Sequence, residues 1–292
     1  MLMATASLAA RIERAECATA SAFAELARMR QPDTLIAPIG GAAAVYGGPG
    51  APFNKLAGLG FAPFDEDVLA AIEREFDARQ APLQAEFSAL GDTRIATTLA
   101  RRGYHLVNFE HVLGFELSRA AVERAADEYA TAERTGVTVR RMRDDEHRPW
   151  IDTVTTGFET PDVFDGPPSH ESYSRELLEQ VFEDVARIPG MVRYVAHRDG
   201  VLAGGGSLRI IDGIAQLAGA ATLPEHRRRG VQSALLRARL VDATRSGCDI
   251  AIVTTQPASK SQENVQRAGF SLLYARAVMV RQPTPTDMVT TP

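Results

Sequence analysis

The sequence predicts an α/β protein with two related halves, and three observations lead to that prediction. Short apolar runs alternate with amphipathic stretches along nearly the whole chain, which is the pattern of strands that alternate with helices. Apolar residues make up 45% and charged residues 24% of the 292 residues, values typical of a folded globular protein. At about 150 residues per domain, this length fits two domains.

The first half is expected to form three helices and several short strands. Its second helix begins at Asp65-Glu66-Asp67, because acidic side chains suit a helix N-terminus. The expected elements are a helix at 5–30, strands at Leu35–Ile39 and Ala42–Tyr46, a helix at Phe64–Gln80, a strand at Leu83–Leu90, a helix at Asp92–Arg102 and an extended segment at Leu106–Leu117. A polar, Ala- and Glu-rich stretch then predicts a linker helix over 118–136.

The second half shows consecutive strands separated by tight turns. Its Gly204-Gly205-Gly206 run lies inside a strand and predicts a bulge or a close backbone approach. The expected elements are strands at Val137–Met142, Val192–His197, Val201–Ile211, Ile214–Leu223, Asp249–Thr255 and Leu272–Val280, and helices at Asp144–Gly157, Tyr173–Arg187, Gly230–Arg245 and Ser259–Ala268. A loop spans Glu159–Ser174, and the Pro/Thr-rich residues 283–292 are expected to be a flexible tail.

An internal repeat relates the two halves at an offset of 166 residues, which places Gly103 on Gly269. The helix Asp67–Gln80 then falls on Ser233–Ser246. The order of elements supports the repeat better than the few identities do. We therefore expect two related domains, residues 1–117 and residues 137–282.

Composition and charge exclude several classes of protein. The net charge of −5 gives no general attraction to nucleic acid or to anionic membranes, so neither is an expected partner. Cys17 and Cys248 are too few for a disulfide framework, and no residues show metal-ligand spacing. The longest uncharged stretch, Thr34–Asn54, contains three prolines and cannot be a membrane-spanning helix. The N-terminus lacks a basic leader, so we expect a cytoplasmic protein.

The most informative stretch is Leu223–Leu236, where a strand ends, a basic turn follows and a helix starts. Unpaired N–H groups at a helix N-terminus bind anions, and Gly230 lets the backbone approach a phosphate closely. Arg227, Arg228 and Arg229 supply positive charge. From charge alone these arginines would be a solvated surface run. The strand–turn–helix setting favours an anion site instead.

This stretch resembles motif A of the GCN5-related N-acetyltransferases (GNAT), with the pattern Arg/Gln-x-x-Gly-x-Gly/Ala after a strand that ends in Val-x-Pro. Arg227 and Gly230 match the first two fixed positions, whereas Gln232 replaces the third and Thr222 replaces the Val. The segment from Ser259 to Phe270 is similar to motif B of this superfamily. The resemblance covers about 137–281 and includes the order of all elements.

The resemblance implies a GNAT fold, with a mixed, mostly antiparallel, twisted sheet flanked by helices. It also implies that acetyl-CoA is the co-substrate and that two central strands separate to admit the pantetheine. An amine or a peptide is the acceptor, lined by the loop Glu159–Ser174. The residues expected to bind acetyl-CoA are Ala221, Thr222, Leu223, Arg227, Arg228, Arg229, Gly230, Val231, Gln232, Ser233 and Asn264.

The acid and base are less well defined by the sequence. Many members of the superfamily place a Tyr four residues before the Gly-Phe pair, and here that position is Val265. Tyr274, on the following strand, is the candidate general acid for the leaving thiolate, with an ordinary packed aromatic as the alternative. Glu225 and His226 are weaker candidates for the base. His170 and Tyr173 in the acceptor loop are candidates that surface roles would equally explain.

The first half resembles a degenerate copy without a CoA site. The turn before its second helix has no arginine, and the carboxylates of Asp65, Glu66 and Asp67 would repel a pyrophosphate. The prediction is therefore an acetyl-CoA-dependent N-acetyltransferase with one site. A homodimer is compatible with this prediction. A CoA-binding protein without catalysis is the alternative. A nucleotide-binding module fits less well, because the turn lacks the Lys-Ser/Thr of a P-loop.

Overall fold

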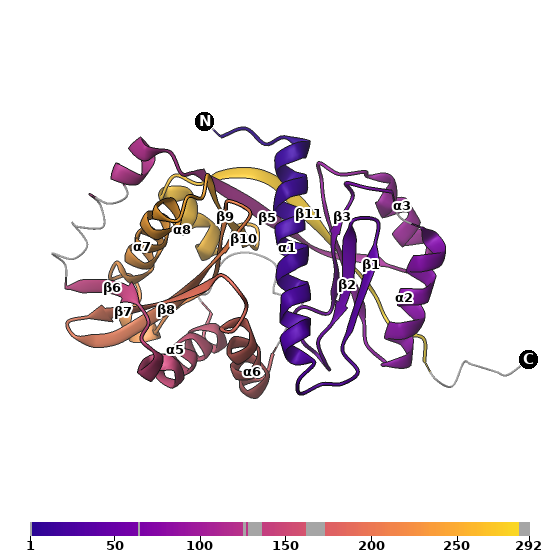
Figure 1. The fold of residues 1–292 in the computed structure, drawn as a ribbon, viewed down its shortest axis with the longest axis horizontal. Helices are drawn as coiled ribbons and strands as arrows, with labels where there is room; N and C mark the ends of the chain where they lie inside the picture. The colour runs from indigo at the N-terminus through magenta and orange to yellow at the C-terminus, as the bar shows by residue number, and fades with distance from the viewer. Residues whose placement is uncertain (1, 64, 125–126, 128–135, 162–172, 286–292) are drawn as a thin grey trace, which may run out of the picture. The chain divides into compact units, whose positions relative to one another are not determined.

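The computed structural model describes residues 2–63, 65–124, 127, 136–161 and 173–285. These residues form two compact units. The N-terminal unit contains residues 3–110 and 274–285 within the described ranges, and the C-terminal unit contains Leu2, residues 111–161 and residues 173–273. Figure 1 labels the elements of both units.

The N-terminal unit combines a sheet, which includes the start of β5, with three helices. Its sheet follows the order β1-β2-β3-β4-β11, with antiparallel pairs except for the parallel pair of β3 and β4. Thr5 caps the first helix, because its hydroxyl accepts a hydrogen bond from Leu8 N. The elements are α1 (Ala6–Ala27), β1 (Leu35–Ile39), β2 (Ala42–Tyr46), β3 (Lys55–Leu59), α2 (Glu66–Ala78), β4 (Leu83–Ser88), α3 (Arg94–Arg101), the start of β5 (His105–Glu116) and most of β11 (Ser271–Arg281).

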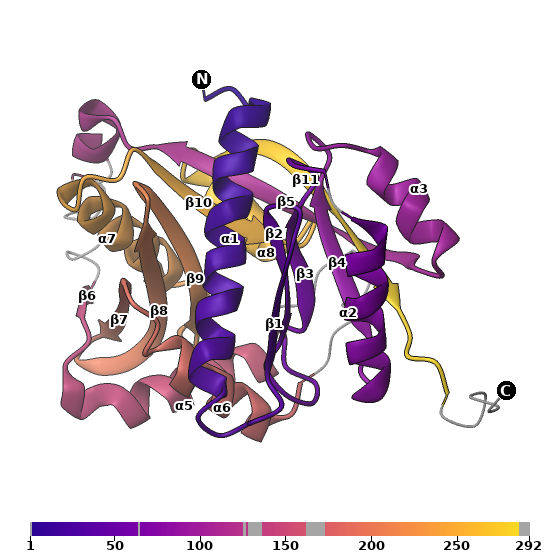
Figure 2. The ribbon, with the colours of Figure 1, turned by 45° about the vertical axis from the view of Figure 1, so that its right-hand side comes forward.

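The C-terminal unit is a six-stranded sheet covered by helices on both faces (Figure 2). Its order is β6-β7-β8-β9-β10-β5, with antiparallel pairs except for the parallel pair of β9 and β10. The elements are β6 (Val137–Arg141), α5 (His147–Glu159), α6 (Arg175–Val185), β7 (Met191–Arg198), β8 (Val201–Ile211), β9 (Ile214–Thr222), α7 (Val231–Arg245), β10 (Ile250–Thr255), α8 (Lys260–Arg267) and the end of β5, with 3-10 turns at Asp144–Glu146 and Pro224–His226.

The two faces of this second sheet carry separate cores. Trp150 and Val154 of α5 pack with Phe182 of α6 on one face. Leu235 and Leu240 of α7 belong to the larger core on the other face. The end of β9 and the start of α7 are therefore held between two packed layers.

The predicted fold class is confirmed, and most predicted elements agree with the structure to within a few residues. The strand β3 (Lys55–Leu59) is an exception, because the sequence analysis expected no strand there. Every residue of β3 is buried, so it lacks the alternation that marks a half-exposed strand. Gly58 has φ +89°, and a Cβ there would lie 3.3 Å from Cys17 Cβ of α1. Most of the predicted linker and tail lies outside the described residues.

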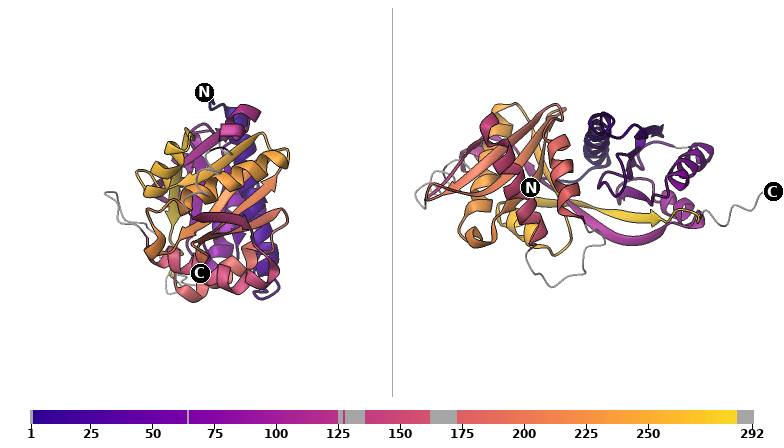
Figure 3. Two further views of the ribbon diagram at one scale, coloured as in Figure 1. Left: turned by 90° about the vertical axis from the view of Figure 1, so that its left-hand side faces the viewer. Right: turned by 90° about the horizontal axis from the view of Figure 1, so that it is seen from below.

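The internal repeat is visible in the element bounds and in the strand pairing. Adding 166 to the bounds of α3 gives those of α8, and each half contains one parallel pair, β3 with β4 and β9 with β10. The long last strands of the two halves, β5 and β11, are exchanged (Figure 3). Residues 111–116 of β5 pair with β10, whereas residues 276–281 of β11 pair with β4. Each unit therefore includes a strand segment from the other half of the sequence.

Candidate active site

The parallel strands β9 and β10 separate along their length. Their ladder joins Ile214 to Ile250 and ends at the pair of Gln216 and Ile252. Both strands continue beyond that point, to Thr222 and Thr255, and each keeps its pairing with its other neighbour. Within the described residues, no ladder pair joins them further on. The backbone groups that face this gap therefore lack strand partners.

A bulge in β9 lies beside the gap. The pairing with β8 advances from Gly205 to Ser207 while β9 advances from Ala221 to Ala218, so β9 carries one extra residue at Gly219–Ala220. Gly219 has φ +54°. The Ser207 hydroxyl donates to Ala218 O at 2.9 Å. Bulges re-aim a strand and end its pairing, which accounts for the start of the gap.

The buried Arg239 of α7 supports the same bulge through hydrogen bonds to the backbone. Its side chain donates Nη1–H to Ser207 O at 3.0 Å and Nε–H to Leu235 O at 3.0 Å. Only 2% of Arg239 is exposed, and no described carboxylate pairs with it. Burial lowers the pKa of its guanidinium to about 10. Arg239 thus links α7 to β8, and Ser207 links β8 to the bulge.

The glycine run of β8 allows the close approaches that the sequence predicted. A Cβ at Gly204 would lie 2.6 Å from Ala221 O, and one at Gly205 would lie 2.7 Å from Trp150 Nε1. A Cβ at Gly206 would lie 3.4 Å from the guanidinium carbon of Arg239. The run therefore admits α5 on one face and α7 on the other, and the prediction of a bulge or close approach is confirmed.

The basic turn leads into α7 with its helix N-terminus open. Arg228 (φ +58°) and Gly230 (φ +83°) both adopt left-handed backbone, and Gly230 occupies the N-cap position without a capping side chain. Nothing lies within 4 Å of a Cβ built at Gly230. Arg228, Arg229 and Ser233 are exposed. The first N–H groups of α7 are thus available to an anion.

Arg227 has a different position from the other two arginines. Its guanidinium donates to Thr160 O, to Thr160 Oγ1 at 3.1 Å and to Thr222 O at 3.3 Å. It also lies 3.4 Å from Gly157 O. Cations stabilise a helix C-terminus, so Arg227 holds the turn against the end of α5. Arg228 and Arg229 are the exposed arginines of the turn.

Three buried polar atoms around the gap have no hydrogen-bond partner among the described residues. They are Thr222 Oγ1 at the end of β9, Thr255 Oγ1 at the end of β10 and His226 Nδ1 in the turn. A buried polar atom without a partner is costly, so such atoms mark positions where a ligand supplies hydrogen bonds. The predicted residues Ala221 and Leu223 flank Thr222, and Leu223 N donates to Ala203 O at 3.0 Å. This end of β9 is therefore firmly held.

Helix α8 lies after the end of β10 and carries Asn264 and Val265, which the sequence analysis named. Asn264 is half-buried, and Val265 is buried in the core. Gln262 Oε1 lies within hydrogen-bond distance, 3.0 Å, of His111 Nδ1, although 151 residues separate the two in sequence. The sequence analysis did not single out His111. Its approach to α8 depends on the exchange of β5, and no local pattern indicates that exchange.

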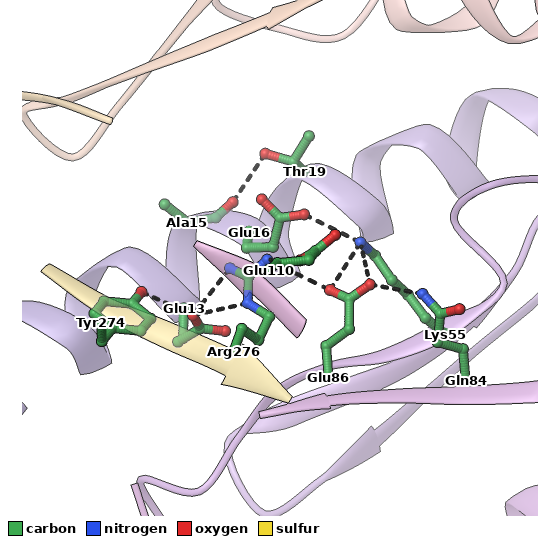
Figure 4. Close-up of polar contacts among 10 residues, drawn as sticks. All are labelled: Glu13, Ala15, Glu16, Thr19, Lys55, Gln84, Glu86, Glu110, Tyr274 and Arg276. Carbon is green, nitrogen blue, oxygen red and sulfur yellow. Dashed lines mark hydrogen bonds and ion pairs between the residues drawn. The ribbon is translucent and has the colours of Figure 1, made fainter. Parts of the chain in front are cut away.

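Tyr274, the predicted general acid, has a buried partner in the N-terminal unit (Figure 4). Its hydroxyl donates to Glu13 Oε1 at 2.8 Å, and Arg276 Nη2 lies 2.9 Å from the same oxygen. Burial and the Glu13 carboxylate raise the pKa of Tyr274. A raised pKa weakens a proton donor. The acid role of Tyr274 stays a prediction.

The remaining predicted residues are placed as follows. Glu225 is exposed, Tyr173 is half-buried against the core of α5 and α6, and His170 lies outside the described residues. In the N-terminal unit, Asp65 caps α2 by accepting Asp67 N at 2.8 Å. The carboxylate start predicted for this helix is confirmed.

In the described parts of the chain, no three His, Cys, Asp or Glu residues form a group that could hold a metal ion. No described helix combines the length and apolarity needed to cross a membrane.

Residues 142–270 match the model of the acetyltransferase (GNAT) family. A GCN5-related N-acetyltransferase from Kribbella flavida is 17% identical and has a TM-score of 0.60, over 90% of this chain and 96% of its own. A tandem GNAT protein from the clavulanic acid biosynthesis pathway is 15% identical with a TM-score of 0.59, over 85% of this chain and 80% of its own. A functionally unknown conserved protein from Staphylococcus epidermidis is 11% identical with a TM-score of 0.57, over 83% and 91%. No curated protein matches the sequence. The likeness to these structures confirms the predicted fold.

Proposed function

We propose that the protein transfers the acetyl group of acetyl-CoA to an amine, on the premise that residues 142–270, which match the acetyltransferase (GNAT) family model, work as a domain of that family. The observation that carries the proposal is the early end of the β9–β10 ladder at Gln216 and Ile252, with an open helix N-terminus at the far end of the gap. A linear ligand with a phosphate at one end and an amide-rich arm fits this combination.

In the proposed complex, the pyrophosphate binds the N-terminus of α7. The N–H groups from Gly230 to Ser233 donate to it, and Arg228 and Arg229 add charge-assisted hydrogen bonds. The pantetheine pairs with β9 around Ala221–Leu223. Thr222 Oγ1 and Thr255 Oγ1 then gain the partners that they lack in the protein alone. Asn264 of α8 is a further proposed contact to this arm.

The reaction is a direct transfer between the two substrates. A neutral amine nitrogen attacks the thioester carbonyl, the new C–N bond forms, and the C–S bond breaks to release the CoA thiolate. The amine loses one proton, and the thiolate gains one. Backbone N–H groups of β9 beside the gap stabilise the developing oxyanion. The protein's acidic net charge of −5 favours a cationic small molecule as acceptor by electrostatic steering, and its reacting nitrogen is neutral when it attacks.

A second candidate function is CoA binding without catalysis. It is favoured by Val265, which occupies the position of the usual tyrosine acid, and by Tyr274, whose hydroxyl is bonded to Glu13. Turnover separates the two functions. Acetyl-CoA is supplied with spermidine, tobramycin and a lysine-containing peptide, and release of CoA thiol is followed. Binding without release of thiol with any of these amines would favour the second candidate.

Calorimetry tests the phosphate end of the site. Replacing both Arg228 and Arg229 with Ala should weaken acetyl-CoA binding by about 1–3 kcal/mol, because charge-assisted hydrogen bonds are lost. The control is Arg245→Ala, which removes an exposed arginine from the last turn of the same helix. Equal affinity for the double variant and the control would refute the site.

A further inference from the structure

We propose that His111 is the proton carrier of the C-terminal unit, accepting a proton from the acceptor amine at Nε2 and returning it to the CoA thiolate. This inference rests on the proposed acetyltransferase function and adds a catalytic residue to it. His111 belongs to the first half of the sequence. The strand exchange makes it part of the C-terminal unit.

The position of His111 follows from strand register. It is the ladder partner of Thr255, the last residue of β10. Thr255 lies three residues beyond Ile252, where the β9–β10 ladder has already ended. His111 is therefore at the open end of the gap, one strand away from it. Side chains of directly opposed residues lie about 5 Å apart at Cβ, so the imidazole and the Thr255 hydroxyl are neighbours.

The hydrogen bonds of Gln262 fix the tautomer of His111. Gln262 Oε1 accepts Ala258 N–H at 3.0 Å, and Gln262 Nε2 donates to Gln266 Oε1 at 3.3 Å. The amide oxygen is thus the atom that faces His111 Nδ1 at 3.0 Å. A carbonyl oxygen only accepts, so Nδ1 carries the hydrogen in the neutral ring. Nε2 then holds the lone pair, which is the arrangement of a general base.

The surroundings of the imidazole support a functional role. No described residue hydrogen-bonds His111 Nε2. Only 5% of the neighbouring residue Thr255 is exposed, and its buried hydroxyl has no partner among the described residues. Ala258, which orients Gln262, has φ +60°, a conformation that costs a non-glycine residue energy and that clusters at active sites. Val265 lies one turn after Gln262 on α8 and has no proton to give.

The proton balance of the step is complete with this one residue. The amine nitrogen forms its bond to the acyl carbon and passes its proton to Nε2, which makes an imidazolium. The tetrahedral intermediate collapses, the C–S bond breaks, and the thiolate sulfur takes the proton from Nε2. His111 returns to its neutral form, and the products are the amide and CoA with a free thiol. No further reactant is needed.

The test compares two substitutions at position 111 in the full chain. His111→Asn keeps an N–H near the place of Nδ1 for Gln262 and removes the base. With the fastest amine of the panel above, kcat should fall by about 10²–10⁴-fold, the usual contribution of general acid–base catalysis, while the acetyl-CoA Kd stays within about twofold. Added imidazole should restore part of kcat to His111→Ala, where the ring's space is open. The control is His105→Asn, an exposed histidine of the same strand.

A third variant tests the tautomer argument. Gln262→Glu keeps acceptors for Ala258 N–H and His111, and its negative charge favours the imidazolium. The acidic limb of kcat/KM should therefore move to higher pH. The inference is overturned if His111→Asn keeps kcat within about threefold of the wild type. It is equally overturned if kcat, Kd and thermal stability fall together without rescue by imidazole. Failure of the proposed function is distinct, because the wild type itself would then release no thiol.

Discussion

Glu110 makes the stability of the N-terminal unit depend on pH, and its replacement by Gln should remove part of that dependence. Glu110 belongs to a buried cluster in which four carboxylates share two cations (Figure 4). Arg276 Nη1 lies 2.9 Å from Glu110 Oε2, and Lys55 Nζ lies 3.0 Å from Glu86 Oε2. The members with charge are Glu13, Glu16, Glu86, Glu110, Lys55 and Arg276. The excess of carboxylates favours a proton on one of them.

The magnitude follows from the pKa of Glu110. Burial, and then the neighbouring Glu86 carboxylate, raise that pKa from 4.5 to about 7. The folded state therefore keeps its proton up to about pH 7, whereas the unfolded chain loses it near pH 4.5. Between these values the folded state binds more protons, so the free energy of unfolding falls as pH rises. The full difference would be about 3 kcal/mol. Because 28% of the side chain is exposed, we expect about 1–3 kcal/mol.

Urea unfolding of the wild type and of Glu110→Gln at pH 4 and pH 8 measures how much Glu110 contributes to the pH dependence of the unfolding free energy. The amide oxygen can still accept from Arg276, but the side chain no longer ionises. The difference in unfolding free energy between variant and wild type should become more favourable to the variant by about 1–3 kcal/mol from pH 4 to pH 8. Groups outside the cluster contribute equally to both proteins and cancel. Glu25→Gln, at an exposed position on α1, is the control. Parallel pH curves for wild type and Glu110→Gln would refute the reasoning.

Three further predictions follow from the same contacts. Tyr274→Phe should cost about 1–3 kcal/mol of stability, because Glu13 loses a hydrogen-bond donor, and should preserve kcat; a fall in kcat without loss of stability would instead support the acid role. Arg239→Met should leave the chain folded but less stable, because Ser207 O and Leu235 O lose their donor, and it should raise the KM for acetyl-CoA several-fold because the bulge loses its support; a changed melting temperature with unchanged KM would contradict this. Residues 137–292 expressed alone should be poorly soluble, because β10 loses residues 111–116; a soluble, fully active fragment would contradict the exchange.

Features that depend on local chemistry were predictable from the sequence. The turn at Gly230 was identified because a left-handed glycine, neighbouring arginines and a following helix are adjacent in the chain. The same holds for the carboxylate start of α2 at Asp65 and for the close approaches at Gly204–Gly206. In each case the physical cause lies within a few residues of the pattern that reports it.

Features that depend on the choice of a strand partner were not predictable. β5 and β11 occupy matching places in the repeat, so either strand could serve as the neighbour of β10 or of β4 on sequence grounds. Pairing is decided by long-range packing, and a single sequence holds no record of it. The contact of His111 with Gln262 was missed for this reason. The network of Lys55, Glu86 and Arg276 was missed too, because its members come from three separate strands.

The strand exchange ties the N-terminal half to the sheet of the C-terminal unit, although its own helix α2 begins at a carboxylate cap. Asp65 now satisfies the N-terminus of α2, where the second half offers the open turn at Gly230. Yet residues 111–116 complete the sheet beside β10, and His111 is among them. A mutation that weakens the first half would therefore disturb β10 and the gap beside it. We infer that the two halves of the sequence are retained together because neither can finish its sheet alone.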